Sequence, residues 1–201
     1  MVWLVLLFFV APAAIFTAAY NRLLTAQVAL KNAFAQIDVL LTRRHELLPN
    51  LIESIREHLP DERHALDVLL AECRAANESL RSAAGDPGGA VAVQQLAGVD
   101  RKLGGALLAL GTLVQRHPEL KASTATAALD EELSTTERRV AVARQAYNNA
   151  VMTYNRDRES FPGSLAAGYF GFTPAYLMPT AANDGSACLP ASSGRAGKTT
   201  A

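Results

Sequence analysis

The chain has 201 residues, half of them apolar, with 19 basic and 19 acidic side chains. A chain of this length can bury one core of ordinary size, so we expect one folded domain. The opposite charges are interspersed and cancel, which argues against the basic surface that nucleic-acid binding requires. The two cysteines, Cys73 and Cys188, lie far apart in sequence and do not form the pattern of a disulfide framework.

The first 21 residues contain no charged side chain. As a helix this stretch would be about 31 Å long, which matches the hydrocarbon core of a bilayer. A cleaved signal peptide is the alternative, because residues 11–13 and 18–19 supply small side chains suited to a cleavage site. No Lys or Arg precedes the apolar run, and the run is long for a signal peptide. We therefore predict a transmembrane anchor over residues 1–21.

Basic residues beside this segment indicate its orientation. None precedes it, whereas Arg22 and Lys31 follow it closely and Arg43 and Arg44 come further on. Because Lys and Arg favour the cytoplasmic side of a span, we expect a single-pass protein of the cell membrane with its bulk in the cytoplasm. In a Gram-negative bacterium this would be the inner membrane. A domain on the outer side of the membrane is the alternative.

Apolar residues after the anchor recur at alternating steps of three and four, a spacing typical of bundled helices. Segments rich in Pro and Gly divide the pattern into four expected helices, over residues 22–57, 61–84, 91–117 and 126–160. Short connections favour antiparallel neighbours. The sequence thus predicts an all-α fold, in which an N-terminal transmembrane helix precedes an antiparallel four-helix bundle with long outer helices, over residues 22–177. Residues 178–201 contain few apolar side chains and are expected to form a disordered tail.

The expected helices differ in length. The outer two would measure about 54 and 52 Å and the middle two about 36 and 40 Å, so the middle hairpin should fall short of the membrane. The outer helices would then run alone for roughly 10 to 15 Å. Residues 163–172 should reach the membrane surface, where the rings of Tyr169, Phe170 and Phe172 suit the interface. Packing of these rings against the end of the bundle is an equally open alternative.

Arg44 occupies a position in the apolar seam of the first helix. A guanidinium group there costs several kcal/mol unless it is paired. Asp38, Glu46, Glu132 and Glu137 are the candidate partners. We favour an internal ion pair that fixes helix register over a recognition site for an acidic partner.

A proline interrupts the helical pattern of the first expected helix. Pro49 removes the backbone hydrogen bond to the carbonyl of His45, so it should kink or restart the helix, with Asn50 as a candidate cap. A kink of this kind is also a common position for a binding groove.

Gly104-Gly105 lies within the pattern of the third expected helix. This glycine pair is expected to mark close helix packing.

The fourth helix carries a Tyr-Asn pair twice, Tyr147-Asn148 and Tyr154-Asn155, at a spacing of seven residues. This spacing places both tyrosines on one face of the helix. Because buried tyrosine hydroxyls need hydrogen-bond partners, we predict a hydrogen-bonded interior layer with Gln36 or Asp38.

Several distinctive blocks follow one another along the chain. They are Asn21-Arg22-Leu23, AQIDVLLTRRHELLPNLIE at residues 35–53, ARQAYNNAV at 143–151 with Tyr154-Asn155, and Phe161-Pro162-Gly163 followed by Phe170-Gly171-Phe172. In sequence and in order, these blocks resemble the LemA family. The resemblance covers about residues 20–177. It implies a single-pass membrane protein with a cytoplasmic helical bundle, and it transfers no catalytic residue. Phe34, His45 and residues 57–62 depart from the family pattern, which affects the local turn and not the fold.

The pattern of potential chemical groups favours binding over catalysis. The four histidines show no HxxxH or HExxH spacing, and no nucleotide-binding glycine motif occurs, so we assign no catalytic residue, cofactor or metal. We expect a membrane-anchored interaction or scaffold protein and not an enzyme, with the lipid bilayer and other proteins as partners. Self-association is compatible with such a surface. The alternative is a bundle enzyme or cofactor-binding protein with a polar site within residues 38–46, formed by Asp38, Arg43, Arg44, His45 and Glu46.

Overall fold

The computed structural model describes residues 2–56, 59, 62–116 and 124–179. Its helices are α1 (Val2–Arg56), α2 (Arg63–Gly85), α3 (Ala90–Arg116), α5 (Thr124–Glu159) and α6 (Gly163–Phe170). The all-α prediction is confirmed, and α2, α3 and α5 lie within a few residues of their expected positions. Helix α1 ends as expected but begins at Val2, so the expected anchor segment and the first bundle helix form one continuous helix. The short helix α6 falls in the segment that we expected at a membrane surface.

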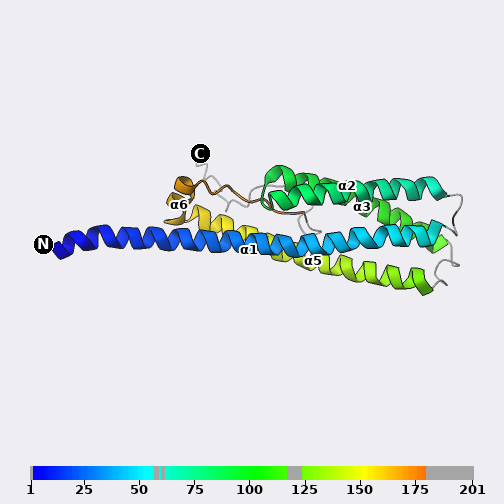
Figure 1. Cartoon of the computed structure of the whole chain (residues 1–201), viewed down its shortest axis with the longest axis horizontal. Coiled ribbons are helices and arrows are strands. Elements are labelled where there is room, and N and C mark those ends of the chain that lie inside the picture. The colour runs from blue at the N-terminus through cyan, green and yellow to red at the C-terminus, as the bar shows by residue number, and fades with distance from the viewer. Residues whose placement is uncertain (1, 57–58, 60–61, 117–123, 180–201) are drawn as a thin grey trace, which may run out of the picture.

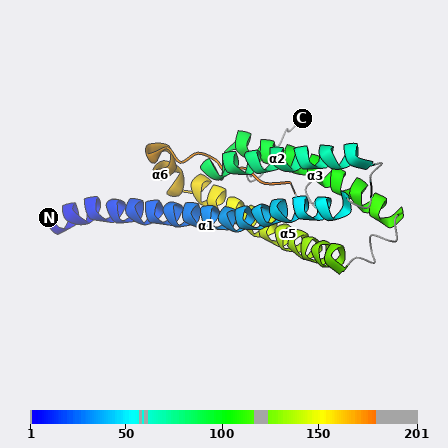
Figure 2. The ribbon, with the colours of Figure 1, turned by 45° about the vertical axis from the view of Figure 1, so that its right-hand side comes forward.

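The long helices run alternately up and down (Figure 1). Helices α1 and α5 form an antiparallel pair, and α2 and α3 form a hairpin that packs on α1 through α2. Figure 2 shows the same arrangement from a second direction. The N-terminal part of α1 projects beyond all other elements, and the α2–α3 hairpin ends well short of it, as the expected helix lengths predicted.

The expected membrane anchor falls only partly within the description, which omits residue 1 and the side chains of residues 2–9, 11 and 12. Within the described residues, no helix carries an apolar stretch long enough to cross a lipid bilayer. Ala19 is the first buried residue of α1 among the described side chains. The packed bundle therefore begins close to this residue.

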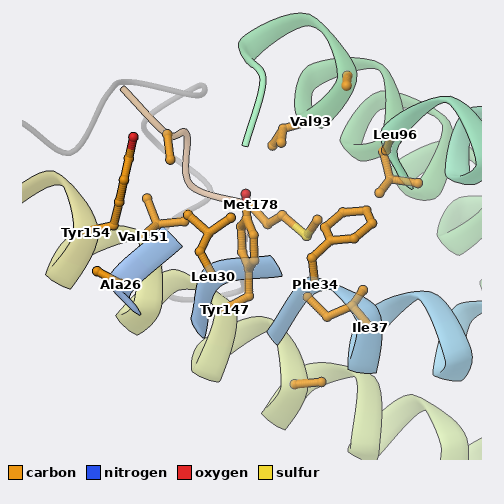
Figure 3. Packing of buried hydrophobic residues seen from close by; sticks show 14 of the residues in the cluster. Ala26, Leu30, Phe34, Ile37, Val93, Leu96, Tyr147, Val151, Tyr154 and Met178 are labelled. Atoms are coloured by element: carbon orange, nitrogen blue, oxygen red, sulfur yellow. The ribbon is translucent and has the colours of Figure 1, made fainter. Parts of the chain in front are cut away.

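Two apolar clusters fill the bundle. The proximal core, nearer the N-terminus of α1, joins α1 and α5 to α6, to the chain after it and to the C-terminal end of α2 and the N-terminal end of α3. Figure 3 shows Phe34, Tyr147 and Met178 meeting there. The distal core joins the other end of α1 to α2, α3 and α5, and includes Leu48, Ile52, Leu66, Leu103 and Leu133. In the four long helices, most of the residues in both clusters recur at steps of three and four, which confirms the periodicity on which these helices were predicted.

Helix α1 continues without a break through Pro49. Asn50 is exposed and lies inside this helix, so the expected restart with Asn50 as its cap is wrong. Apolar packing on both sides of the proline holds the helix together, because Leu47, Leu48 and Leu51 are all buried.

We had expected the outer helices to run alone beyond the hairpin, but they do not. Helix α6 packs on both α1 and α5, and the chain after it lies along the same pair. Met178, which we had placed in the tail, is buried in the proximal core. The packed chain therefore continues through residue 178, and residues 180–201 of the expected tail lie outside the described residues.

Candidate functional site

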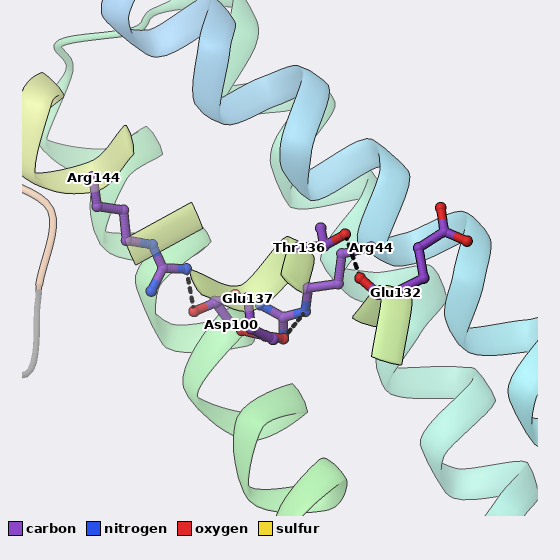
Figure 4. A network of polar contacts seen from close by, with 6 residues as sticks. All are labelled: Arg44, Asp100, Glu132, Thr136, Glu137 and Arg144. Carbon is purple, nitrogen blue, oxygen red and sulfur yellow. Dashed lines mark hydrogen bonds and ion pairs between the residues drawn. The ribbon is translucent and has the colours of Figure 1, made fainter. Parts of the chain in front are cut away.

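A charged layer separates the two cores and centres on Arg44, whose side chain is only 2% exposed. The Arg44 Nη1 atom donates to Asp100 Oδ1 at 2.9 Å, and its Nε lies 3.0 Å from Glu137 Oε1. Arg144 Nη2 donates to the second oxygen of Asp100 at 2.6 Å (Figure 4). Helices α1, α3 and α5 are thus tied together by two arginines and two carboxylates, and the four charges cancel.

This arrangement supports the internal ion pair that we favoured for Arg44. Of the four candidate partners, only Glu137 contacts Arg44, and Asp100 was missed. Glu132 and Glu46 instead pair with Arg43 on the surface of the bundle. Sequence spacing places Asp100 beside the seam of α3, but it does not say which seam positions of two different helices meet.

His45 is buried next to the charged layer. Asn77 lies beside the ring, although neither ring nitrogen makes a well-formed hydrogen bond. Burial, together with the neighbouring charge of Arg44, lowers the pKa of His45 to about 4, while Asp100 acts in the opposite direction. The imidazole is therefore neutral at neutral pH.

The polar residues within 38–46 do not converge on one site. Arg43 and Glu46 are exposed, Asp38 is half-buried, and Arg44 and His45 are buried and face the core. Among the described residues, no group of three His, Cys, Asp or Glu side chains is placed to hold a metal ion. His58 and His117 lie outside the described side chains. This geometry gives no support to the alternative of an enzyme or cofactor site here.

The two asparagines of the Tyr-Asn repeat hold the extended chain that follows α6. Asn155 donates to the carbonyl of Ala175 at 2.7 Å and accepts from its N–H at 3.0 Å. Asn148 makes the same pair of bonds with Met178, at 2.9 and 2.8 Å. Each amide side chain therefore satisfies both backbone groups of one residue, as a neighbouring β-strand would.

The two tyrosines of the repeat bind the same segment. The hydroxyl of Tyr154 donates to the carbonyl of Thr173 at 2.8 Å. The Tyr147 hydroxyl lies 2.7 Å from the carbonyl oxygen of Pro87 and 2.9 Å from that of Tyr176, so its single proton is shared. We call Tyr147, Asn148, Tyr154 and Asn155 the clamp, and residues 172–178 the clamped segment.

The spacing of the clamp explains its register. Seven residues of α-helix rise about 10.5 Å, and three residues of extended chain span about 10 Å. A repeat of seven on α5 therefore matches a step of three in the clamped segment, which is the observed separation of Ala175 from Met178 and of Thr173 from Tyr176. The interior layer was predicted correctly, but its expected partners Gln36 and Asp38 were wrong, because the clamp side chains bond to the carbonyl of Pro87 and to backbone groups within residues 173–178. Pro174 and Pro179, which favour extended backbone, were the available sequence signal.

Helix α6 carries an aromatic cluster to the N-terminal part of α1. The ring of Phe170 lies 4.5 Å from that of Tyr20 and 6.0 Å from that of Phe16, measured between ring centroids, and Phe172 also contacts Tyr20. Tyr169 meets Phe16 at its edge, yet it remains 80% exposed. The rings therefore pack on the bundle, as one alternative expected, and still present apolar surface to the surroundings.

The turn before α6 is tightly built. The Phe161–Pro162 peptide bond is cis, and the ring of Phe161 is 78% exposed. A side chain at Gly163 would meet the carbonyl oxygen of Asp157, since a Cβ atom there would lie 2.0 Å from it. The carboxylate of Asp157 accepts two hydrogen bonds from Arg22, at 2.6 and 3.0 Å. These contacts fix α6 against the α1–α5 pair.

A groove of about 1030 Å³ opens between α3 and α5 in the distal half. Its floor is apolar and includes Leu51, Ile55, Leu110 and Leu133, and the charged layer closes one end. Within the described residues, α3 packs closely on α2 and α5 on α1, whereas the backbones of α3 and α5 stay apart. The expectation that Gly104-Gly105 marks close packing is wrong, because a Cβ atom at either position would have no neighbour within 4 Å.

Comparison with known proteins agrees with the resemblance seen in the motifs. No match was found among curated proteins. A model of the LemA family matches residues 33–187. This match covers well over half of the chain, including all of α2, α3, α5 and α6 and the clamped segment. The chain belongs to the LemA family.

Proposed function

We propose that this protein is a membrane-anchored helical bundle that binds other proteins as a scaffold and does not catalyse a reaction. One observation carries the proposal: most of the described polar side chains buried in the bundle are engaged with the chain's own groups, His45 being an exception. Arg44 is paired with two carboxylates, and Asn148 and Asn155 are bonded to backbone. Catalysis needs polar groups aimed at a place where a substrate can sit. Here they hold the fold together.

The proposed anchor rests on the uncharged run of residues 1–21. It is supported by the aromatic rings at the same end of the bundle, because Phe161, Tyr169 and Phe170 are exposed there. Aromatic side chains are enriched where protein meets the headgroup region. An anchor in the cell membrane would hold these rings near that region, and Arg22 and Lys31 favour a cytoplasmic bundle.

Protease accessibility tests the anchor and its orientation. The full chain, tagged after Ala201, is treated with protease in intact cells and in inverted membrane vesicles. We expect cleavage of the bundle in inverted vesicles only, with the tagged protein remaining in the membrane fraction. Cleavage on intact cells, or recovery of a protein that lacks its first residues, would contradict this topology.

Site-specific photo-crosslinking in living cells tests the binding role. A photoreactive phenylalanine is placed at Val68 on α2, Leu108 on α3 or Val142 on α5, all of which are exposed apolar positions. We expect discrete protein adducts from at least one of these faces. A scaffold role would be contradicted if none of the three positions gave a protein adduct while the protein was present at its normal level.

A further inference from the structure

The groove between α3 and α5 is long and open. Its lining runs from Asp100 to Gly111 on α3 and from Ala127 to Arg144 on α5. These stretches correspond to about 16 and 25 Å of helix. Its volume of about 1030 Å³ lies at the upper end of the range of about 300–1,000 Å³ for small-molecule pockets. The elongated shape fits a segment of chain better than a compact ligand.

The α3 wall of the groove is unusually bare. Gly104, Gly105 and Gly111 line it, and a Cβ atom at any of the three would have open space around it. Leu108, on the same wall, is 75% exposed. Glycines allow another backbone to approach closely, and the leucines of the floor offer apolar contact.

The sequence of α5 indicates that the occupant is helical. In the proximal half, an extended segment is buried because the clamp satisfies its backbone groups. One and two repeats earlier, the clamp positions on α5 hold Val140-Ala141 and Leu133-Ser134, which lack the amide groups of the clamp. A segment that enters the distal groove must therefore satisfy its own backbone hydrogen bonds, and an α-helix does so.

The charges around the groove indicate which charges the side chains of its occupant should carry. Arg44, Arg144, Asp100 and Glu137 neutralise one another at the closed end. The α5 rim then presents the exposed carboxylates of Asp130 and Glu131, of which Glu131 lies 3.7 Å from Arg138 Nη2, while the α3 side of the groove presents the exposed Arg101. Complementary charge on a partner would be basic on the side that faces α5.

We propose that this groove binds an amphipathic α-helix of another protein, with an apolar stripe flanked by Lys or Arg on the side facing α5. The bound helix would be about three to four turns long, to match the lining of the groove. The inference rests on the proposed scaffold role and names the binding surface. The groove lies at the end of the bundle away from α6, so a membrane at the N-terminal end would leave it accessible.

A photoreactive model peptide tests the proposal. The probe is a helical peptide of about 14 residues built from Leu and Lys, with a benzophenone group in its apolar stripe. It is added to the full chain in phosphatidylcholine nanodiscs, and adducts are mapped by mass spectrometry. We expect adducts at residues 104–111 and 127–134. A matched Leu/Glu peptide should give roughly tenfold less adduct, because it places carboxylates against Asp130 and Glu131 on the α5 side of the groove.

Two glycine substitutions provide a matched pair. Gly105→Leu fills the groove, whereas Gly98→Leu adds the same side chain to the same helix at an exposed position that does not line it. Both replace glycine within a helix and should leave the thermal stability equal or higher. We expect Gly105→Leu to reduce the adduct by roughly tenfold or more and Gly98→Leu to leave it unchanged.

Three results would overturn the proposal. Adducts that map outside the groove, or that respond equally to the two substitutions, would show that the groove is not the site. Chain-to-chain contacts that disappear in Gly105→Leu would identify a second copy as the occupant. Failure of the peptide to bind, while Val68 or Val142 still captures protein partners in cells, would refute the groove and leave the scaffold role intact. Loss of capture at all three crosslinking positions would refute the scaffold role itself.

Discussion

The two halves of the α1–α5 pair are completed in different ways. In the proximal half, α6, the clamped segment and the ends of α2 and α3 next to their connecting turn cover the pair, and Ala175 and Met178 are buried there. In the distal half, α3 stands apart from α5 and a groove remains between them. The apolar seam is similar in both halves. The difference lies in the Tyr-Asn repeat, which supplies backbone partners in one half only.

The comparison teaches that apolar surface alone does not decide how a bundle is covered. An extended segment can be buried only where side chains meet its N–H and C=O groups. The clamp provides this for Ala175 and Met178 through Asn155 and Asn148. Where such side chains are missing, the apolar surface can be covered by elements, such as α-helices, that satisfy their own backbone hydrogen bonds.

The largest effect is expected at the charged layer between the halves. Replacing Asp100 by Leu leaves the buried Arg44 with Glu137 as its only carboxylate and deprives Arg144 of its partner. We expect a loss of about 3 kcal/mol in the free energy of unfolding, because an uncompensated buried charge is costly. Urea unfolding of the full chain in mild detergent measures it. Arg43→Ala, which breaks only the exposed ion pairs with Glu46 and Glu132, serves as the control and should cost less than about 1 kcal/mol.

Unequal losses are expected within the clamp. Asn155 is fully buried, whereas Asn148 is half-buried, and each makes two bonds to the clamped segment. Asn155→Ala should cost about 2 to 3 kcal/mol, because it leaves the backbone groups of Ala175 unsatisfied, and Asn148→Ala about 1 kcal/mol. The same unfolding measurement applies. Equal, small losses would mean that the clamped segment is held by apolar packing and not by the clamp.

A pH dependence follows from the buried histidine. The pKa of His45 is about 4 in the folded chain, against a usual value of 6.5. Between these values the unfolded chain binds more protons, so stability is lost as the pH falls through this window. We expect a loss of about 2 kcal/mol between pH 7.5 and pH 5 from this group, which His45→Gln should remove. An identical pH dependence in wild type and variant would contradict the burial of the ring.

The smallest effect is expected in the distal half, at the groove between α3 and α5. Gly105→Ala should raise the free energy of unfolding by about 0.5 to 1 kcal/mol, because alanine favours helix and meets no neighbouring atom. Gly98→Ala should do the same. Thermal unfolding compares the two. If Gly105→Ala destabilised the chain while Gly98→Ala did not, α3 and α5 would be packed together at this point and the groove would be closed.

The helices were predictable because apolar residues recur in the sequence at the spacing of the buried face of a helix. Leu30, Phe34 and Ile37 repeat along α1 at the spacing that its buried face requires. Arg44 was recognisable as needing a partner for the same reason. Asp100 was not recognisable as that partner, because the choice depends on how far the α2–α3 hairpin slides along α1.

The contacts of the clamped segment were beyond the sequence pattern. Tyr147 and Tyr154 indicated a buried polar layer, but its partners in the chain after α6 lie within residues 173–178, for which we had predicted no contacts. A segment without helical or alternating periodicity gives no sign of what it packs against. Gly104 and Gly105 led to a wrong prediction of close packing within the chain for a related reason. Glycine in a helix allows close approach of any backbone, including one that is not part of the chain.

Amide hydrogen exchange of the full chain, measured with and without the Leu/Lys peptide, tests the difference between the halves most directly. The account predicts that the amides of Ala175, Tyr176 and Met178, which are hydrogen-bonded, exchange slowly without the peptide and do not respond to it. Residues 104–111 and 127–134 should exchange faster and slow down when the peptide binds. Equal protection of both halves without the peptide, or free exchange of the clamped segment, would contradict the account.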